Sequence, residues 1–144
     1  MATPTYLTQE PEYNFEQALD FAKTFFRLWP SEVDVFFSPC EVGDQIEYAP
    51  EQVISDINWT DIHPIKQVYM NFNCNTGQRM WDPLVIINAV EGNSLFNLSE
   101  RGIVTFTDEA VTLFSPSPTG PHRYQLPGND AWNTTMLNKT KNSN

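Results

Sequence analysis

The spacing of apolar residues between Phe15 and Trp29 constrains the fold more than any other feature of this sequence. Apolar side chains recur there mostly at steps of three and four residues, and Asn14 with Gln17 forms a capping box in front of them. Pro30 follows directly, and a residue before proline is disfavoured in the helical conformation. The pattern predicts one amphipathic helix that ends at Trp29 and buries its apolar face against another element.

Beyond Pro30 the apolar residues alternate instead, which is typical of strands. Pro50 and Glu51 suit the first turn of a short helix whose apolar positions are Val53, Ile54 and Ile57. The continuous apolar run 84–90 favours a central strand that is covered on both faces. The expected strands are 33–38, 45–48, 68–72, 84–90, 95–98, 103–107, 111–114 and 124–126.

These elements predict an α+β fold in which one N-terminal amphipathic helix packs on a curved antiparallel sheet of about five to seven strands. Turn residues between the later strands favour a β-meander in the C-terminal half. Few apolar residues flank this region, so flexible arms are expected at both ends. The predicted organisation is an arm over 1–12, a single domain over 13–127 and a polar tail over 128–144.

Charge bears on the class of partner. The chain has 144 residues, with 18 Asp and Glu against 8 Lys and Arg, and a net charge of −10. Binding of nucleic acid or an anionic membrane requires basic residues, so neither is expected as a direct partner. Residues 1–61 hold twelve acids against Lys23 and Arg27, and therefore carry the whole net charge. Contact with a protein partner is predicted at Glu41, Asp44, Glu47, Asp56 and Asp61, and in the tail at Trp132, Met136 and Leu137.

No motif in the sequence indicates catalysis. Nucleophile elbows, phosphate loops, dinucleotide fingerprints and paired Cys-x-x-Cys are absent from the sequence. The spacings of acids, Cys40, Cys74 and the two histidines match no metal loop or zinc motif. We therefore expect no enzyme activity, no cofactor and no metal. The first residues do not resemble a secretory signal and no apolar run would span a bilayer, which predicts a cytoplasmic or virion protein with two free thiols.

An alternative interpretation assigns the isolated aromatic and titratable residues to a ligand pocket. Its walls would include Trp29, Trp59, Tyr69 and Trp81, with His63 beside them. In that interpretation a buried carboxylate, Asp56 or Asp61, acts as a general base in a small enzyme.

The order of the elements over residues 14–114 is similar to two groups of proteins. A helix, a hairpin, a short helix and a meander resemble the nuclear-transport-factor-like cone fold, which implies a pocket. A helix in front of a small antiparallel sheet also resembles the neck and tail-terminator ring proteins of tailed phages, which implies assembly through arms. The leading hypothesis is a non-catalytic assembly protein, ring-forming or of virion type, which associates with itself or a neighbouring subunit. The second is an acidic inhibitor or immunity-type protein that binds a basic partner.

Overall fold

The computed structural model describes residues 10–60, 62–72 and 77–141, which form a mixed α+β structure with two compact units. Unit 1 consists of the described residues up to Glu41 together with Leu98–Leu126. Unit 2 consists of Val42–Asn97 and the described residues from Pro127 onward. None of the helices in the described ranges has the length and apolar character that crossing a bilayer requires.

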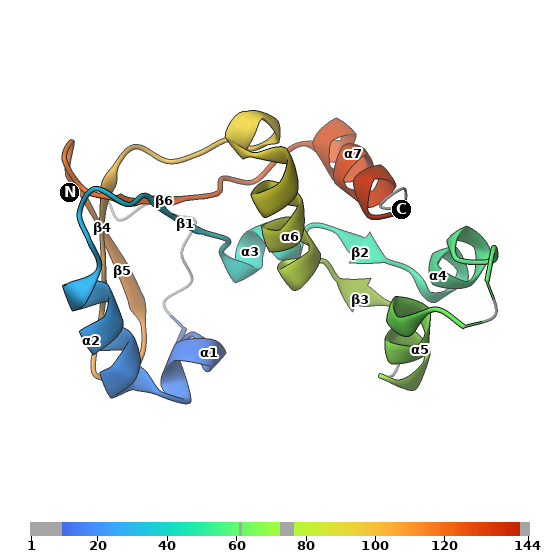
Figure 1. Ribbon diagram of the computed structural model, residues 1–144, viewed down its shortest axis with the longest axis horizontal. Coiled ribbons are helices and arrows are strands. Elements are labelled where there is room, and N and C mark those ends of the chain that lie inside the picture. The colour runs from blue at the N-terminus through green and yellow to red at the C-terminus, as the bar shows by residue number, and fades with distance from the viewer. Residues whose placement is uncertain (1–9, 61, 73–76, 142–144) are drawn as a thin grey trace. The chain divides into compact units, whose positions relative to one another are not determined.

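Unit 1 contains a mixed sheet in the order β1-β6-β4-β5. Its strands are β1 (Val35–Phe37), β4 (Gly102–Phe106), β5 (Thr112–Pro116) and β6 (His122–Tyr124). Strands β4 and β5 form an antiparallel hairpin, whereas β1 lies parallel to β6. Figure 1 shows β1 and β6 side by side although most of the chain separates them. Val104, Phe114 and Tyr124 are buried on one face of this sheet.

Two helices cover that face, and they replace the single helix predicted over 14–29. Helix α1 (Tyr13–Glu16) ends before Ala18, whose φ of −153° is not helical, and α2 (Leu19–Leu28) follows. In one straight helix Phe15 and Phe26 would lie about 16 Å apart along the axis. The break allows their ring centroids to approach to 5.9 Å, and Phe15 also contacts Phe106 at 4.6 Å. Aromatic packing in the core therefore outweighs helix continuity.

Unit 2 is mainly helical. Its regular elements after α3 (Cys40–Gly43) are β2 (Glu47–Tyr48), α4 (Pro50–Asp56), α5 (Pro64–Asn71), β3 (Gln78–Arg79), α6 (Trp81–Glu91), η2 (Asn93–Leu95) and α7 (Asp130–Lys141). Strands β2 and β3 pair antiparallel (Figure 1). Ile46, Met80, Leu84 and Met136 are almost completely buried and belong to its core.

The structure confirms the α+β class and corrects the sheet. Among the described residues one sheet has four strands, with a parallel pair, and a second has two; an antiparallel sheet of five to seven strands is not found. Hairpin β4–β5 and helix α4 lie close to their predicted positions. The predicted strands 68–72 and 84–90 are helical, in α5 and α6, and 95–98 contributes only an isolated bridge from Leu98 to Gln125.

The strand prediction for 84–90 was wrong because a continuous apolar run has no period. Such a run suits a covered strand and a helix equally well, and the flanking residues have to decide. Asp82 and Pro83 lie in the first turn of α6, where an acid and a residue without an N–H are favoured. Gly92, with φ of 74°, ends the helix. The described part of the predicted polar tail is also regular, because 130–141 forms α7.

Candidate functional site

Two of the acidic residues predicted to contact a partner are bonded within unit 2. Asp44 accepts a hydrogen bond of 3.0 Å at its carboxylate from the indole N–H of Trp81. Asp56 accepts a hydrogen bond of 3.2 Å from the hydroxyl of Tyr48. Tyr48 is buried, and buried hydroxyls are generally hydrogen-bonded, so this bond contributes to satisfying the Tyr48 hydroxyl. Both carboxylates therefore have structural roles.

The other predicted acidic contacts have different surroundings. Glu47 forms an ion pair of 3.2 Å with Arg79 on the paired strand, which holds β2 against β3. Glu41 lies in α3 and lines a groove of unit 1. Asp61 lies outside the described residues. Among the described residues, these acids do not form a group that could hold a metal ion.

The predicted contact residues of the C-terminal segment are built into unit 2. The indole N–H of Trp132 donates a hydrogen bond of 2.6 Å to the carbonyl of Leu95, and its ring lies edge-on to Phe96 at 5.8 Å. Met136 is 0% exposed and Leu137 is half-buried. In this conformation Met136 stabilises the unit and is not accessible to a partner.

The predicted pocket residues are distributed over both units. Trp29 belongs to unit 1, where its indole N–H donates to the carbonyl of Val33 at 2.8 Å. In unit 2, Trp59 and His63 contact each other with ring centroids 5.2 Å apart. Trp81 packs against Gly43, where a side chain would overlap its ring. Tyr69 has its backbone in α5, but its side chain lies outside the described part of the structure.

Unit 1 contains a groove of about 310 Å³ between its first helices and strand β1. Its lining includes aromatic residues and three acidic residues; the acidic residues are Glu10, Glu12 and Glu41. The side chains of Ser38 and Cys40 also line it. Sequence analysis did not select Glu10 and Glu12, since they precede the first regular element and carry no motif.

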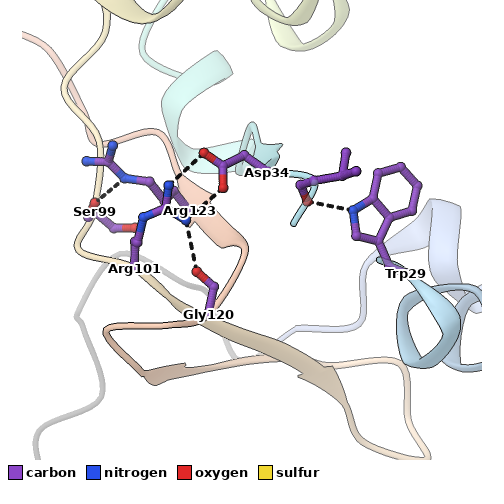
Figure 2. A network of polar contacts seen from close by, with 7 residues as sticks. Trp29, Asp34, Ser99, Arg101, Gly120 and Arg123 are labelled. Carbon is purple, nitrogen blue, oxygen red and sulfur yellow. Dashed lines mark hydrogen bonds and ion pairs between the residues drawn. The ribbon is translucent and has the colours of Figure 1, made fainter. Parts of the chain in front are cut away.

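A polar network holds the ends of the unit 1 strands. Figure 2 shows Arg101 donating two hydrogen bonds of 2.7 Å to the carboxylate of Asp34 and a third, of 3.1 Å, to the carbonyl of Gly120. Arg123 donates from Nε to the carbonyl of Ser99 at 2.9 Å. The bidentate bond from Arg101 lowers the pKa of Asp34 below its ordinary value. This network fixes the approach to β1, β4 and β6, and none of its residues lines the groove described above.

His122 is a buried titratable group in unit 1. Its Nδ1 accepts a hydrogen bond of 2.8 Å from the amide of Val104, which places the ring proton on Nε2. Nε2 has no hydrogen-bond partner among the described residues. Phe26 and Phe37 lie edge-on to the ring at 5.7 and 5.5 Å. Burial in these aromatic surroundings lowers the pKa of His122, so the ring is neutral in the folded protein at pH 7.

One helix of each unit has an exposed apolar face. We call Val85, Ile86, Ala89 and Val90 the α6 face; its three large side chains are 52, 63 and 77% exposed, while Leu84 and Ile87 are buried on the opposite side. We call Phe21, Phe25 and Leu28 the α2 face, in which Phe21 is 79% exposed. The steps of four and three residues align the α2 face along one side of its helix. Contiguous patches of exposed apolar side chains mark interaction surfaces more often than single exposed apolar side chains do.

The α6 face was missed because the run 84–90 was interpreted as a strand. The start and end signals at Pro83 and Gly92 would have identified the helix, and a helix that is apolar all round is expected to be covered on every side. In the described structure Leu84 and Ile87 are covered, whereas Val85 and Val90 on the other side of α6 are exposed.

No protein-family model matches the chain, and no curated protein matches it significantly. Among the described residues, no group of three or more His, Cys, Asp or Glu side chains is arranged to hold a metal ion.

Proposed function

We propose that this chain is a non-catalytic assembly protein whose exposed helix faces contact other copies of the same chain. The observation that carries the proposal is the α6 face, an uncharged surface between Asp82 and Glu91. Its four residues span an arc of about 140° around the helix. Leaving such an arc in water costs free energy that contact with a second apolar surface would recover.

Charge supports a contact at this face. Each copy carries −10, so two copies repel each other wherever acidic surfaces meet. The α6 face contributes no charge, and contact there brings the fewest like charges together. At the C-terminal end of α6, Glu91 forms an ion pair with Lys139, in which Nζ lies 2.8 Å from Oε1. This is the ion pair of α6 in the described part of the structure.

Two different apolar faces favour an assembly larger than a dimer. Contact of one surface with itself produces a closed pair, whereas contact between two different surfaces produces a ring or a filament. The α6 face in unit 2 and the α2 face in unit 1 supply two such surfaces. We therefore propose a ring-forming or virion-type component, present in the cytoplasm or in a particle, in which both faces contact neighbouring copies.

The test measures mass in solution. Native mass spectrometry and light scattering over a wide concentration range should show an assembly of more than two copies. Ile86→Glu and Phe21→Glu should each reduce its mass, because each places a charge in one face. Val68→Glu is the matched control, since Val68 is also exposed but lies in α5, outside both faces. Circular dichroism should show unchanged helix content in all three variants.

A strict monomer at every concentration would refute the assembly proposal. A dimer that dissociates on Ile86→Glu but ignores Phe21→Glu would refute the ring and retain self-association. Equal effects of Val68→Glu and Ile86→Glu would show that neither face is specific.

A second candidate function is binding of a basic protein partner. The groove of unit 1 favours it, because carboxylates and aromatic rings line the same space.

A further inference from the structure

The four-stranded sheet of unit 1 is narrowly joined in its middle. Strands β4 and β5 pair from Gly102 to Phe106, and β1 and β6 pair over the whole of both strands. Between these two halves, β4 and β6 share the single register pair Gly102–His122. A change at this pair therefore affects how the two halves of the sheet are held together.

The side chain of His122 extends this contact along β4. Its Nδ1 accepts a hydrogen bond of 2.8 Å from the amide of Val104, two residues beyond Gly102. A side chain of β6, in place of a backbone carbonyl, thus holds the Val104 amide. We call the contact formed by Gly102, Val104 and His122 the β4–β6 junction. His122 is 3% exposed, and its Nε2 has no hydrogen-bond partner among the described residues.

The surroundings of the His122 ring do not favour a positive charge. Phe26 of α2 and Phe37 of β1 lie against it, with ring centroids 5.7 and 5.5 Å away. The charged residues on or directly beside the packed elements α2, β1, β4 and β6 comprise four cations and two acids: Lys23, Arg27, Arg101, Arg123, Asp20 and Asp34. In the described structure none of them bonds to the ring, and Asp34 is paired with Arg101 at 2.7 Å. A proton on the ring would therefore place a charge in a buried site without a carboxylate partner.

We propose that the β4–β6 junction is an acid-sensitive contact that opens when His122 takes up a proton. A proton from solvent binds Nδ1 and converts this atom from an acceptor into a donor, so it can no longer bind the Val104 amide. The closed junction then contains a buried cation and an amide without an acceptor, and both raise its free energy. Opening brings the ring into water, where the charge is solvated.

The opposite side of Gly102 is held by bonds that are independent of this proton. The amide of Ser99 donates to the carbonyl of Tyr124 at 2.9 Å, and the amide of Tyr124 donates to the hydroxyl of Ser99 at 3.0 Å. Arg101 donates to the carbonyl of Gly120 at 3.1 Å. None of these groups titrates near neutral pH, so the opening is confined to the Val104 side of the junction.

The test measures amide hydrogen exchange by NMR on the full chain at pH 7.5, 6.5 and 5.5. Each observed rate is divided into the intrinsic rate at the same pH, which gives a protection factor. The ordinary pKa of 6.5 applies to the open ring, and burial lowers the pKa of His122 in the closed junction. The protection factor of Val104 should consequently fall by up to about tenfold between pH 6.5 and 5.5, since the open form binds one more proton. The protection factor of Tyr124 should stay constant.

Two variants with the same exchange of side chain provide the control. His122→Asn retains a side-chain oxygen that can accept from the Val104 amide, and it does not titrate. Its Val104 protection factor should be independent of pH. His63→Asn removes the histidine of unit 2 and should leave the acid-dependent loss at Val104 unchanged. In the native protein, ring ¹⁵N shifts at pH 7.5 should show the proton on Nε2.

Three results would overturn the proposal: a Val104 protection factor that does not change on acidification, an equal loss at Val104 and Tyr124, or the same acid-dependent loss in His122→Asn. The comparison of Val104 with Tyr124 uses the native protein, so it decides the question even if a variant does not fold. The junction lies wholly in unit 1, and its failure leaves the mass measurements on Ile86→Glu unaffected.

Discussion

His122→Phe removes the histidine of unit 1 while retaining an aromatic ring beside Phe26 and Phe37. In the folded protein, protonation of Nδ1 would break its hydrogen bond from the Val104 amide, and both nitrogens are buried. Burial lowers the pKa of His122 from its ordinary value of 6.5, whereas the unfolded chain retains that value. Phenylalanine does not titrate, so in the variant the folded and unfolded states do not differ in proton binding at this position.

The direction of the pH effect follows from proton binding. As the pH falls below 6.5, the unfolded chain takes up a proton at His122 before the folded protein does. Stability is therefore lost from pH 6.5 downward, until the pH reaches the lowered pKa of the folded state. If the folded ring stays neutral, this one group reduces the free energy of unfolding by about 1.4 kcal/mol between pH 7.5 and 5.5. That figure is an upper bound.

Urea unfolding at pH 7.5, 6.5 and 5.5, followed through the NMR methyl signals of Val104, measures the stability of the unit that contains His122. The difference between the native protein and His122→Phe removes contributions from groups that titrate in both. We expect the native protein to lose stability relative to the variant on acidification, by up to about 1.4 kcal/mol. His63→Phe, in unit 2, is the control and should leave the pH dependence of unit 1 unchanged. Parallel pH profiles for the native protein and His122→Phe would refute the reasoning.

Two further predictions concern the polar network of unit 1 and the core of unit 2. Arg101→Gln should raise the pKa of Asp34 toward its ordinary value of 3.8 in a carboxyl NMR titration, and Arg123→Gln should raise it less, because the bidentate hydrogen bond from Arg101 is the largest cause; equal shifts would contradict this. Met136→Ala should destabilise unit 2 by about 2–5 kcal/mol in chemical denaturation, since Met136 is fully buried. Thr135→Ala, on the exposed side of α7, should cost less than about 0.5 kcal/mol, and a similar cost for both would place Met136 outside the core.

Local signals predicted those elements that are stabilised by residues close to one another in the chain. Hairpin β4–β5 follows from two β-rich segments joined by a short turn, and α4 follows from Pro50 and Glu51 at its start. The sequence did not predict how β1 reaches its neighbour. Its parallel pairing with β6 places Val35 opposite His122, which are far apart in the chain, and the turn signals between them contain no information on that pairing.

The candidate sites were less predictable than the elements. The acids Asp44, Glu47 and Asp56 were identifiable as a base-free stretch, but their bonds to Trp81, Arg79 and Tyr48 depend on side chains from other elements. Glu12 could not be selected from the sequence. The hydrogen bond from its amide to the carbonyl of Ala110 helps to place it in the groove that aromatic residues of α1, α2 and β1 also line.

The sequence by itself determined the net charge, its concentration in residues 1–61, the apolar face of the first helical segment and the positions of several strands. Those properties depend on composition and on periods of two to four residues, which the chain carries locally. The tertiary structure decided the break at Ala18, the burial of Met136 and the exposure of the α6 face. Each of these depends on which distant surface a side chain meets, and packing over long range outweighs local preference when the two differ.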